Sequence, residues 1–295
     1  MIWLKVLIIV VLVIFVLFCL FSIWHSGTHF RKERCRYFDD KIKEPVKLVF
    51  LTDLHDMEYG EGNSKLIKAI EEEDPDAVLV TGDMLTAGEN RTVKVAERLI
   101  ERLAEKYPVY YSLGNHEAKL SWDRARYGQR YEAYIEEISA AGAKVLRNEF
   151  IQLGEHQIRI YGLDMEQIYY KRFKKAPMDD DYLAKKLGRL DDYKYFNILL
   201  AHNPMYFEKY AKWKPEIVLS GHVHGGLIRL PILGGVIAPN LQLFPKYDGG
   251  RFFKEQSVMV LSRGLGFHSV EFRMWNPGEL HIIELYPHKM MQSFQ

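Results

Sequence analysis

The hydrophobic positions of this chain fall into one long uninterrupted run near the amino terminus and many short runs beyond it. The long run covers residues 6–24 and contains no charged side chain. A helix of about 20 such residues crosses a lipid bilayer. A cleaved signal peptide has a shorter apolar core followed by small residues, which the stretch from Phe21 to Ser26 does not offer. We therefore expect residues 1–27 to form a retained anchor, and the chain to be a single-pass protein of the cell membrane.

The composition turns polar and basic after the anchor. Residues 28–44 show no hydrophobic period, which predicts a juxtamembrane linker. Four basic residues follow the apolar run closely, whereas only Lys5 and the amino terminus precede that run; the four are Arg31, Lys32, Arg34 and Arg36. Because positive charge flanking a membrane span favours the cytoplasmic side, we expect the rest of the chain to face the cytoplasm.

Short β-branched runs then alternate with helical patterns. Strands are expected at residues 46–51, 77–81 and 109–113, and helices at 64–73 and 93–106. This alternation is typical of βαβ units, and the nearly all-apolar strands indicate a sheet covered by helices. The first part of the soluble region is therefore expected to be α/β.

The second half of the chain has a mixed pattern. It predicts a helix at 131–141, an antiparallel hairpin at 150–161, and strands at 196–201, 217–220, 258–261 and 280–285. A loop-rich insertion with Gly and Pro covers 225–250. We expect one α/β domain with mixed sheets over residues 45–287, followed by a tail at 288–295.

Charge and cysteine content exclude some classes of protein. The 295 residues include 40 basic and 39 acidic side chains, and this balance argues against a stable nucleic-acid partner. The two cysteines, Cys19 and Cys35, supply neither a disulfide framework nor a thiolate metal site.

Polar residues follow five of the expected strands at the point where each strand ends. A single Asp or His in such a place is more often a cap or a turn residue than a ligand. Five such endings together indicate a site, because open α/β sheets bind ligands at the carboxyl ends of their strands. His222 and His224 can point to the same side if their segment is extended. The residues in question are Asp53, His55, Asp83, Asn115, His116, His202, His222 and His224.

This set combines oxygen and imidazole ligands without thiolates. It suits manganese, iron or zinc, with magnesium as a further option. The number of ligands exceeds what one catalytic ion needs, which favours two divalent ions, and Asp83 could bridge ions about 3.5–4 Å apart. A single-metal hydrolase of amide or acyl bonds is the alternative, but it leaves Asn115 and half of the histidines without a role.

The succession TDLHD, TGD, GNHE, AHNP and SGHVHGG over residues 52–226 resembles the calcineurin-like metallophosphoesterases. With its single anchor, the chain is similar to the bacterial transmembrane members, a group that includes UDP-diacylglucosamine hydrolases. The resemblance implies an α/β fold of two facing mixed β-sheets flanked by helices. It also implies that one metal is held by Asp53, His55, Asp83 and His224, and the other by Asp83, Asn115, His202 and His222.

In the same pattern, His116 donates a proton to the leaving group, and Glu117 orients it. The chain is accordingly interpreted as a membrane-anchored enzyme that hydrolyses phosphomonoester, phosphodiester or pyrophosphate bonds with a hydroxide held between two metals. Its partners would be a phosphorylated small molecule or lipid and, through residues 6–24, the bilayer. The alternative is a membrane-tethered metal-binding scaffold without turnover.

Several other residues have two interpretations. Asp56 is either a support of the site or a solvated loop residue, and Arg263 either contacts substrate phosphate or forms a structural ion pair. Tyr169 and Tyr170, with the basic residues after them, are expected to form a surface loop without a role. The apolar residues of the insertion at 225–250 could line a groove for a lipid tail or could pack within the fold.

Overall fold

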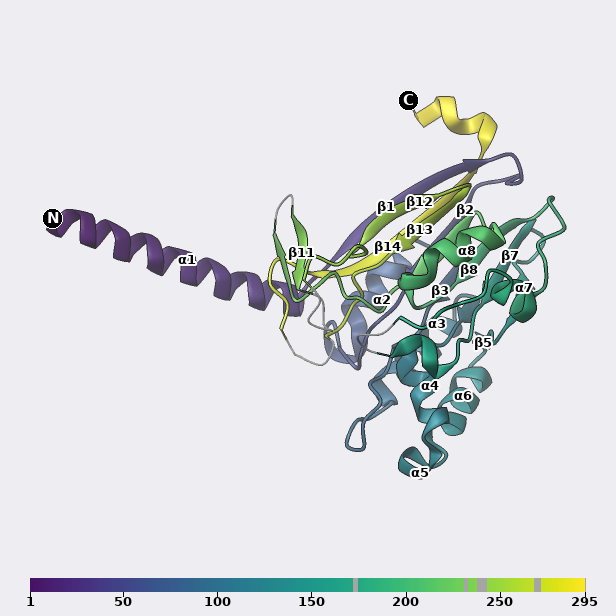
Figure 1. The fold of residues 1–295 in the computed structure, drawn as a ribbon, viewed down its shortest axis with the longest axis horizontal. Coiled ribbons are helices and arrows are strands. Elements are labelled where there is room, and N and C mark those ends of the chain that lie inside the picture. Colours follow the sequence, from purple (N-terminus) through teal and green to yellow (C-terminus); the bar gives the residue numbers. More distant parts are fainter. Residues whose placement is uncertain (172–174, 231–232, 238–242, 268–271, 295) are drawn as a thin grey trace.

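Two six-stranded sheets pack face to face in the computed structural model, which describes residues 1–171, 175–230, 233–237, 243–267 and 272–294 (Figure 1). The first sheet has the order β1 (Phe30–Asp39), β14 (Gly278–Pro287), β2 (Val46–Leu51), β3 (Ala77–Val80), β4 (Val109–Tyr111) and β5 (Lys144–Val145). The second has the order β12 (Gly250–Lys254), β13 (Ser257–Leu261), β9 (Ile217–Ser220), β8 (Phe196–Leu200), β7 (Ile158–Gly162) and β6 (Glu149–Gln152).

Strand β2 shows why both faces of the first sheet are apolar. Leu48 and Phe50 belong to the core between the two sheets, whereas Val49 and Leu51 pack under the helices on the outer face. This alternation follows from the two-residue period of a strand. The outer face of the first sheet is covered by α2 (Ser64–Glu71), α3 (Lys94–Ala104) and α6 (Arg130–Ala140), and that of the second by α7 (Tyr182–Leu187) and α8 (Phe207–Trp213). The expected fold of two facing mixed sheets flanked by helices is confirmed.

Most neighbouring strands next to the site run parallel. β2, β3 and β4 are parallel in one sheet, and β7, β8, β9 and β13 are parallel in the other. The strands expected from the hydrophobic pattern are all present, and the expected hairpin at 150–161 is the antiparallel pair β6 and β7. Parallel strands bring their carboxyl ends to one edge, so the polar residues that follow them meet there.

The expectation of a linker at residues 28–44 is wrong for its central part. Residues Phe30–Asp39 form β1, which pairs in parallel with β14 along its whole length. The strand lacks a hydrophobic period because its basic side chains pair with acidic groups of the fold: Arg31 lies 2.8 Å from Glu279, and Arg34 lies 2.5 Å from Glu284. Strand β1 is therefore part of the folded domain.

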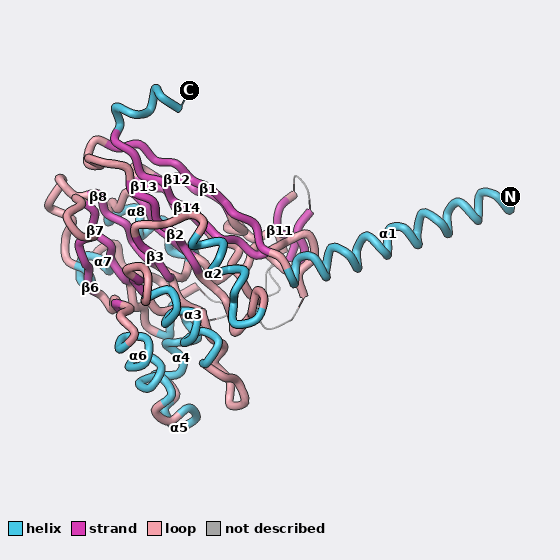
Figure 2. The backbone as a smooth tube through the Cα atoms, turned by 180° about the vertical axis from the view of Figure 1, so that it is seen from behind, coloured by secondary structure: helices cyan, strands magenta, loops and turns pink. Residues whose placement is uncertain are grey.

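Helix α1 (Ile2–Thr28) projects from one end of the domain (Figures 1 and 2). It is the one helix of the described chain that is long and apolar enough to cross a membrane, with a mean hydropathy of 3.6 over an 18-residue stretch. The carboxyl-terminal segment is the 3₁₀ helix His288–Phe294, whose Phe294 ring packs against Phe38 of β1. Within the insertion at 225–250, β10 (Ile228–Leu230) and β11 (Gly234–Ile237) form a small antiparallel pair.

The remaining helices lie in the connections. They are α4 (Asn115–Trp122), α5 (Arg124–Tyr127) and the short 3₁₀ helices Glu61–Asn63, Gln167–Tyr170 and Pro204–Tyr206. Helix α4 begins directly after β4, at the edge where the two sheets present their polar residues. This connection places the start of a helix beside the site.

Candidate metal centre

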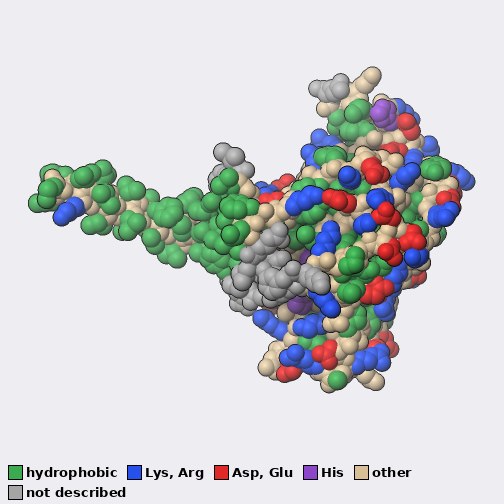
Figure 3. Space-filling model, in the orientation of Figure 1, with side chains coloured by type: hydrophobic (Ala, Val, Ile, Leu, Met, Phe, Trp, Pro, Cys, Tyr) green, Lys and Arg blue, Asp and Glu red, His purple; other side chains and the backbone are tan. Residues whose placement is uncertain are grey.

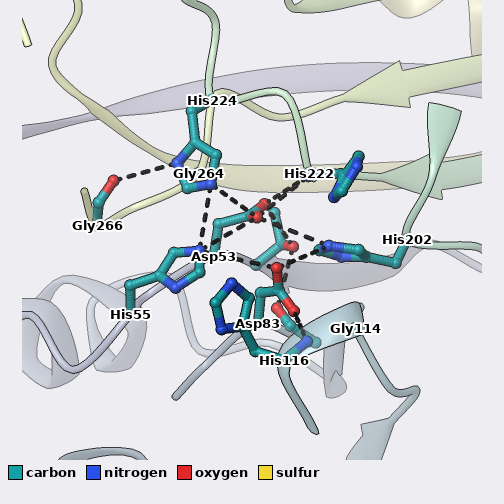
Figure 4. A network of polar contacts seen from close by, with 12 residues as sticks. Asp53, His55, Asp83, Gly114, His116, His202, His222, His224, Gly264 and Gly266 are labelled. Carbon is teal, nitrogen blue, oxygen red and sulfur yellow. Dashed lines mark hydrogen bonds and ion pairs between the residues drawn. The ribbon is translucent and has the colours of Figure 1, made fainter. Parts of the chain in front are cut away.

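The structure brings the polar strand ends of both sheets into one cluster (Figure 4). Asp53 and His55 follow β2, and Asp83 follows β3, all from the first sheet. His202 follows β8 of the second sheet, and His222 and His224 follow β9. Asp53, Asp83 and His202 are fully buried. Such burial of charged and imidazole groups is costly unless they have partners of opposite charge.

The cluster divides into adjoining groups. In the first, His224 Nε2 lies 3.2 Å from Asp53 Oδ1 and 3.2 Å from His55 Nε2. In the second, His202 Nε2 lies 3.1 Å from Asp83 Oδ2, and a nitrogen of His222 lies within 4.8 Å of both. His55 Nε2 also lies 3.8 Å from Asp83 Oδ2, so Asp83 stands between the two groups. This arrangement suits two neighbouring ions with one carboxylate between them.

The ring of His202 gives a direct test of whether a cation fits. Its Nδ1 contacts the carbonyl oxygen of Thr81 at 2.8 Å, and because a carbonyl only accepts, Nδ1 must donate. In the neutral ring, Nε2 then directs a lone pair at the Asp83 carboxylate. With the ring in this neutral form, four buried atoms of this region find no hydrogen-bond donor among the described residues: Asp83 Oδ2, Asn115 Oδ1, His202 Nε2 and His222 Nδ1. Lone pairs that converge in this way fit a metal cation.

The pKa values of the two histidines in the second group move in opposite directions. Burial lowers the pKa of His202, but the carboxylates of Asp83 and Asp53 outweigh burial and raise it to about 9. Burial and the neighbouring His202 lower the pKa of His222 to about 3. A proton on His202 therefore satisfies the carboxylates when no other cation does, whereas His222 keeps a lone pair for a ligand.

The backbone at this site adopts conformations that side chains rarely take. Asp53, His55, Asp83, His222 and His224 all have φ between +48° and +74°. Such left-handed non-glycine residues cost free energy and cluster at functional sites. The two histidines after β9 are thus not in an extended segment, the condition under which they could point to one side. Each joins a different candidate ligand group, as the family resemblance implies.

Two glycines allow these loops to approach one another. A Cβ atom at Gly114 would lie 2.2 Å from Asp83 Oδ1, and one at Gly221 would lie 2.0 Å from Asp53 Oδ2. Any side chain at either position would displace a carboxylate of the cluster. The glycines in the TGD, GNHE and SGHVHGG segments therefore include two that close packing requires.

His116 is held at the edge of the cluster by its backbone and its ring. Its backbone N–H donates to Asp83 Oδ1 at 2.7 Å, and its Nδ1 accepts from the backbone N–H of Ala87 at 2.9 Å. Because Nδ1 accepts, the neutral ring carries its proton on Nε2. Distance alone would also permit a ligand role, since His116 forms a group with His55 and Asp83. Burial lowers the pKa of His116.

Glu117 does not orient His116, contrary to the sequence-based expectation. Its fully buried carboxylate accepts hydrogen bonds from the backbone N–H groups of Asp83 at 2.8 Å, Met84 at 2.9 Å and Gly114 at 3.0 Å, and from the Tyr111 hydroxyl at 2.7 Å. Burial raises its pKa to about 7. Glu117 thus joins the loop after β3 to the loop after β4 and positions Asp83.

Two residues lie beside the site although the sequence left the role of one open and assigned no role to the other. Asp56 is half-buried, and its Oδ2 accepts from the backbone N–H of Thr86 at 3.0 Å, next to the residue that binds His116. Tyr170 lies with its ring centroid 5.6 Å from that of His222 and 6.0 Å from that of Trp122. No local sequence signal distinguishes these residues from ordinary loop residues; Arg172, in the same segment, lies outside the described residues.

Of the two interpretations of Arg263, contact with substrate phosphate or a structural ion pair, the structure favours the ion pair. Its Nε lies 3.0 Å from Glu279 Oε1, and its aliphatic stem fills the space beside Gly225 and Gly249. The guanidinium group therefore serves an ion pair within the fold.

Two facing mixed sheets whose strand ends gather Asp and His side chains into adjoining groups that could hold metal ions are the arrangement of a metallophosphoesterase. The sequence profile described as "Calcineurin-like phosphoesterase" matches residues 46–226, more than half of the chain. This chain belongs to the calcineurin-like phosphoesterase family.

Individual relatives carry the same kind of name. The chain is 28% identical to metallophosphoesterase Cj0846 of Campylobacter jejuni, over 83% of this chain and 60% of the relative. It is 26% identical to phosphodiesterase YaeI of Escherichia coli, over 70% of this chain and 71% of the relative. It is 27% identical to the "Transmembrane protein with metallophosphoesterase domain" of Danio rerio, over 81% of this chain but 53% of the relative. The chain thus spans little more than half of the first and last of these proteins.

Proposed function

We propose that this protein is a membrane-anchored phosphoesterase that uses two divalent ions to hydrolyse phosphomonoester, phosphodiester or pyrophosphate bonds. The observation that carries the proposal is the contact of His202 Nε2 with Asp83 Oδ2 at 3.1 Å, where the Thr81 carbonyl fixes the ring so that Nε2 faces the carboxylate. Such a contact requires a cation, which a proton on His202 supplies in the metal-free protein and a metal ion would supply in its place. The apolar length of α1 supports the anchor.

Seven side chains would hold the ions. Asp53, His55 and His224 form one ligand group and His202 and His222 another, with Asp83 between them. Asn115, whose Oδ1 is buried and has no hydrogen-bond partner in the described part of the chain, completes the second group in this proposal. The ions, when bound, supply a nucleophile at neutral pH and neutralise charge on the phosphoryl oxygens. Manganese, iron, zinc and magnesium all suit these ligand atoms.

The protein itself would supply the proton for the leaving group. Ala87 donates to Nδ1 of His116, so the neutral ring carries its proton on Nε2, and His116 lies in one group with His55 and Asp83. A proton delivered to the departing oxygen lowers the barrier most for poor leaving groups. A scaffold without turnover has no use for such a donor, and for this reason we favour an enzyme over that alternative.

Two features bear on the class of substrate: the name of one relative and the membrane anchor. YaeI is named a phosphodiesterase, which favours a diester among the three bond types. An anchor in the bilayer favours a lipid-linked phosphate, with a nucleotide-linked phosphate as the other candidate. We propose a phosphorylated small molecule or lipid as the substrate, on the basis of these features together.

A substrate screen tests the proposal. The full chain in detergent, loaded with manganese, is assayed on nitrophenyl monoesters, nitrophenyl diesters, nucleoside diphosphates and lipid phosphates. We use the full chain because Ser22 and Ser26 of α1 contact the domain. The Asp83→Asn variant, purified in parallel, corrects for contaminating phosphatases. Hydrolysis of at least one class above that variant supports an enzyme, whereas metal binding without hydrolysis of any class supports the scaffold.

The number of ions separates the remaining alternative. A hydrolase of amide or acyl bonds with a single metal would bind one ion per chain. Two ions per chain in a metal titration support the present proposal, and one ion supports that alternative.

A further inference from the structure

The insertion at 225–250 carries a cluster of exposed apolar side chains next to the membrane helix. Leu233, Leu243 and Phe244 are 62%, 63% and 59% exposed. Leu243 and Phe244 are held in place by β structure, since Leu243 forms a β-bridge with Ile237 and the backbone N–H of Phe244 donates to the carbonyl oxygen of Val236 at 2.9 Å. We call these three side chains, with the pair β10 and β11, the apolar hairpin. Soluble proteins rarely leave such a cluster in water.

Charge is nearly absent from this surface. Arg229 is the one charged residue of the sequence between Leu227 and Phe244. Its guanidinium group is turned into the fold, where it lies 3.0 Å from Asp248 and donates to the carbonyl oxygens of Gly225 and Asp248. The outer face of the hairpin is therefore apolar without a competing exposed charge among its described residues.

Contacts with α1 set the depth of this region. The ring of Trp275 lies 5.9 Å from that of Phe18, and the backbone N–H groups of Trp275 and Asn276 donate to Ser22 Oγ at 2.8 Å and Ser26 Oγ at 3.1 Å. Phe18 lies six residues before Trp24, the end of the apolar run, which is roughly 9 Å along a helix. Trp275 thus contacts α1 within its apolar run, at the depth of the interfacial zone of a bilayer, where Trp side chains are enriched.

The hairpin is attached to the same loop. Met274 forms a β-bridge with Ile228, its backbone N–H donates to the carbonyl oxygen of Leu227 at 3.0 Å, and its carbonyl oxygen accepts from Arg229 at 3.1 Å. Figure 3 shows that the hydrophobic side chains of α1 continue onto the region of this hairpin. The apolar surface of the helix and that of the domain are therefore continuous.

We propose that the apolar hairpin and Trp275 form a second membrane contact, which lies in the interfacial layer of the bilayer that α1 crosses. This inference rests on the proposed anchoring by α1. An apolar face buried about 5–10 Å into the headgroup region is the usual form of such contacts. A second protein chain is a less suitable occupant, because the same surface is bordered by α1 at the level of Phe18.

The contact would fix the distance between the metal centre and the membrane surface. The side chain of Asn276 donates to the carbonyl oxygens of His224 and Gly226, each at 2.7 Å. The backbone N–H of the same residue binds Ser26 of α1. The loop that meets the bilayer thus also holds the chain at a metal-ligand candidate, so the site would work at the level of the lipid headgroups.

Site-directed spin labelling of the full chain tests this contact. Single cysteines replace Leu233, Leu243 or Phe244 in a background with Cys19→Ala and Cys35→Ala. The protein is reconstituted in vesicles of phosphatidylcholine and phosphatidylglycerol, and power saturation compares collisions with oxygen, which enters the bilayer, and with a water-soluble nickel chelate. Phe253→Cys is the matched control, because Phe253 is 73% exposed and lies on β12. Val11→Cys reports the insertion of α1.

Labels at the three hairpin positions should meet oxygen more often than nickel, as the label at Val11 does, whereas the label at Phe253 should show the reverse order. Hairpin labels that behave like Phe253 while Val11 is protected from nickel would overturn the second contact and leave the anchor intact. Exposure of Val11 itself to nickel would remove both the anchor and this inference. Circular dichroism of each labelled protein checks that the fold is retained.

Discussion

The backbone N–H of Ala87 donates to Nδ1 of His116 over 2.9 Å, and this bond places the ring proton on the opposite nitrogen. The His116→Gln variant should therefore retain its metals while the chemical step slows by roughly 10²–10⁴-fold. The loss should be far greater on alkyl phosphate esters than on nitrophenyl esters, because nitrophenolate departs without a proton. Single-turnover rates on both esters, with metal analysis of the same samples, measure this effect.

The control for this prediction is the metal content and thermal stability of His116→Gln. If His116 had only a structural role, its replacement would lower the stability of the fold or the metal content, or would lower the rates on the two esters by the same factor. Equal losses on the two esters, with metals and folding unchanged, would falsify the proton-donor role and assign His116 to substrate positioning.

Asp83 stands between the two ligand groups, at 3.1 Å from His202 and 3.8 Å from His55. We expect Asp83→Asn to lose both ions, whereas Asp53→Asn should mainly weaken one. Elemental analysis after dialysis against a defined manganese concentration measures both. Asp180→Asn, at an exposed carboxylate paired with Lys209 and Lys212, is the control. Two tightly bound ions in Asp83→Asn would rule out a bridging carboxylate.

Glu117 accepts four hydrogen bonds with both of its carboxylate oxygens. Glu117→Gln replaces one acceptor by an N–H₂ group that faces donors, so we expect a loss of about 1.5–3 kcal/mol in the free energy of unfolding. Manganese affinity should fall as well, because the loop that carries Asp83 loses its support. Urea unfolding and metal titration measure these changes. Glu105→Gln, at an exposed side chain, should change neither; an unaltered Glu117→Gln would contradict the positioning role.

His281 contributes stability that depends on pH. Burial lowers its pKa, but Glu279, with Nε2 to Oε2 at 3.1 Å, and Cys35 outweigh burial and raise the pKa to about 9. A histidine with a raised pKa stabilises fully below its unfolded pKa of about 6.5 and loses this stabilisation as the pH rises through about 9. Each unit by which the pKa is raised contributes about 1.4 kcal/mol. The free energy of unfolding should therefore fall by a few kcal/mol, on the order of the total shift, as the pH rises across this window.

Urea unfolding midpoints, measured with a chelator present at pH values from roughly 6 to 10, report how stability depends on pH. This range brackets the unfolded and folded pKa values of His281. His281→Gln should flatten the profile, whereas His288→Gln, at an exposed histidine, should leave it as it is. A profile that keeps its slope in His281→Gln would assign the dependence to other groups.

The side of the membrane remains a prediction from charge. Arg31 and Arg34 follow the anchor but pair with Glu279 and Glu284 in the folded domain. The positive-inside rule nevertheless acts on the chain during insertion, and we expect the domain to face the cytoplasm. Protease treatment of sealed vesicles should digest the domain in inside-out vesicles and spare it in right-side-out vesicles. Digestion in right-side-out vesicles would reverse the orientation.

The local pattern of the sequence was sufficient for much of the fold. Runs such as Val46–Leu51 are apolar on both faces because β2 lies between a core of strands and a layer of helices. The strand Phe30–Asp39 escaped recognition because ion pairs to β14, rather than burial of alternate apolar side chains, hold it in the sheet. Hydrophobic periodicity indicates which side chains are buried. It therefore does not predict a strand whose side chains form ion pairs.

The sequence by itself determined the types of ligand and their places at strand ends, since Asp53, Asp83 and His202 each follow an apolar run. The family resemblance already implied which of them share an ion, but only the tertiary structure shows how the chain achieves this grouping. His222 and His224 lie two residues apart, yet left-handed backbone turns send them to different groups, and Glu117 supports Asp83 rather than its neighbour His116. Strand ends are a local property of the chain, whereas side-chain direction and hydrogen-bond partners depend on loops brought together from distant segments.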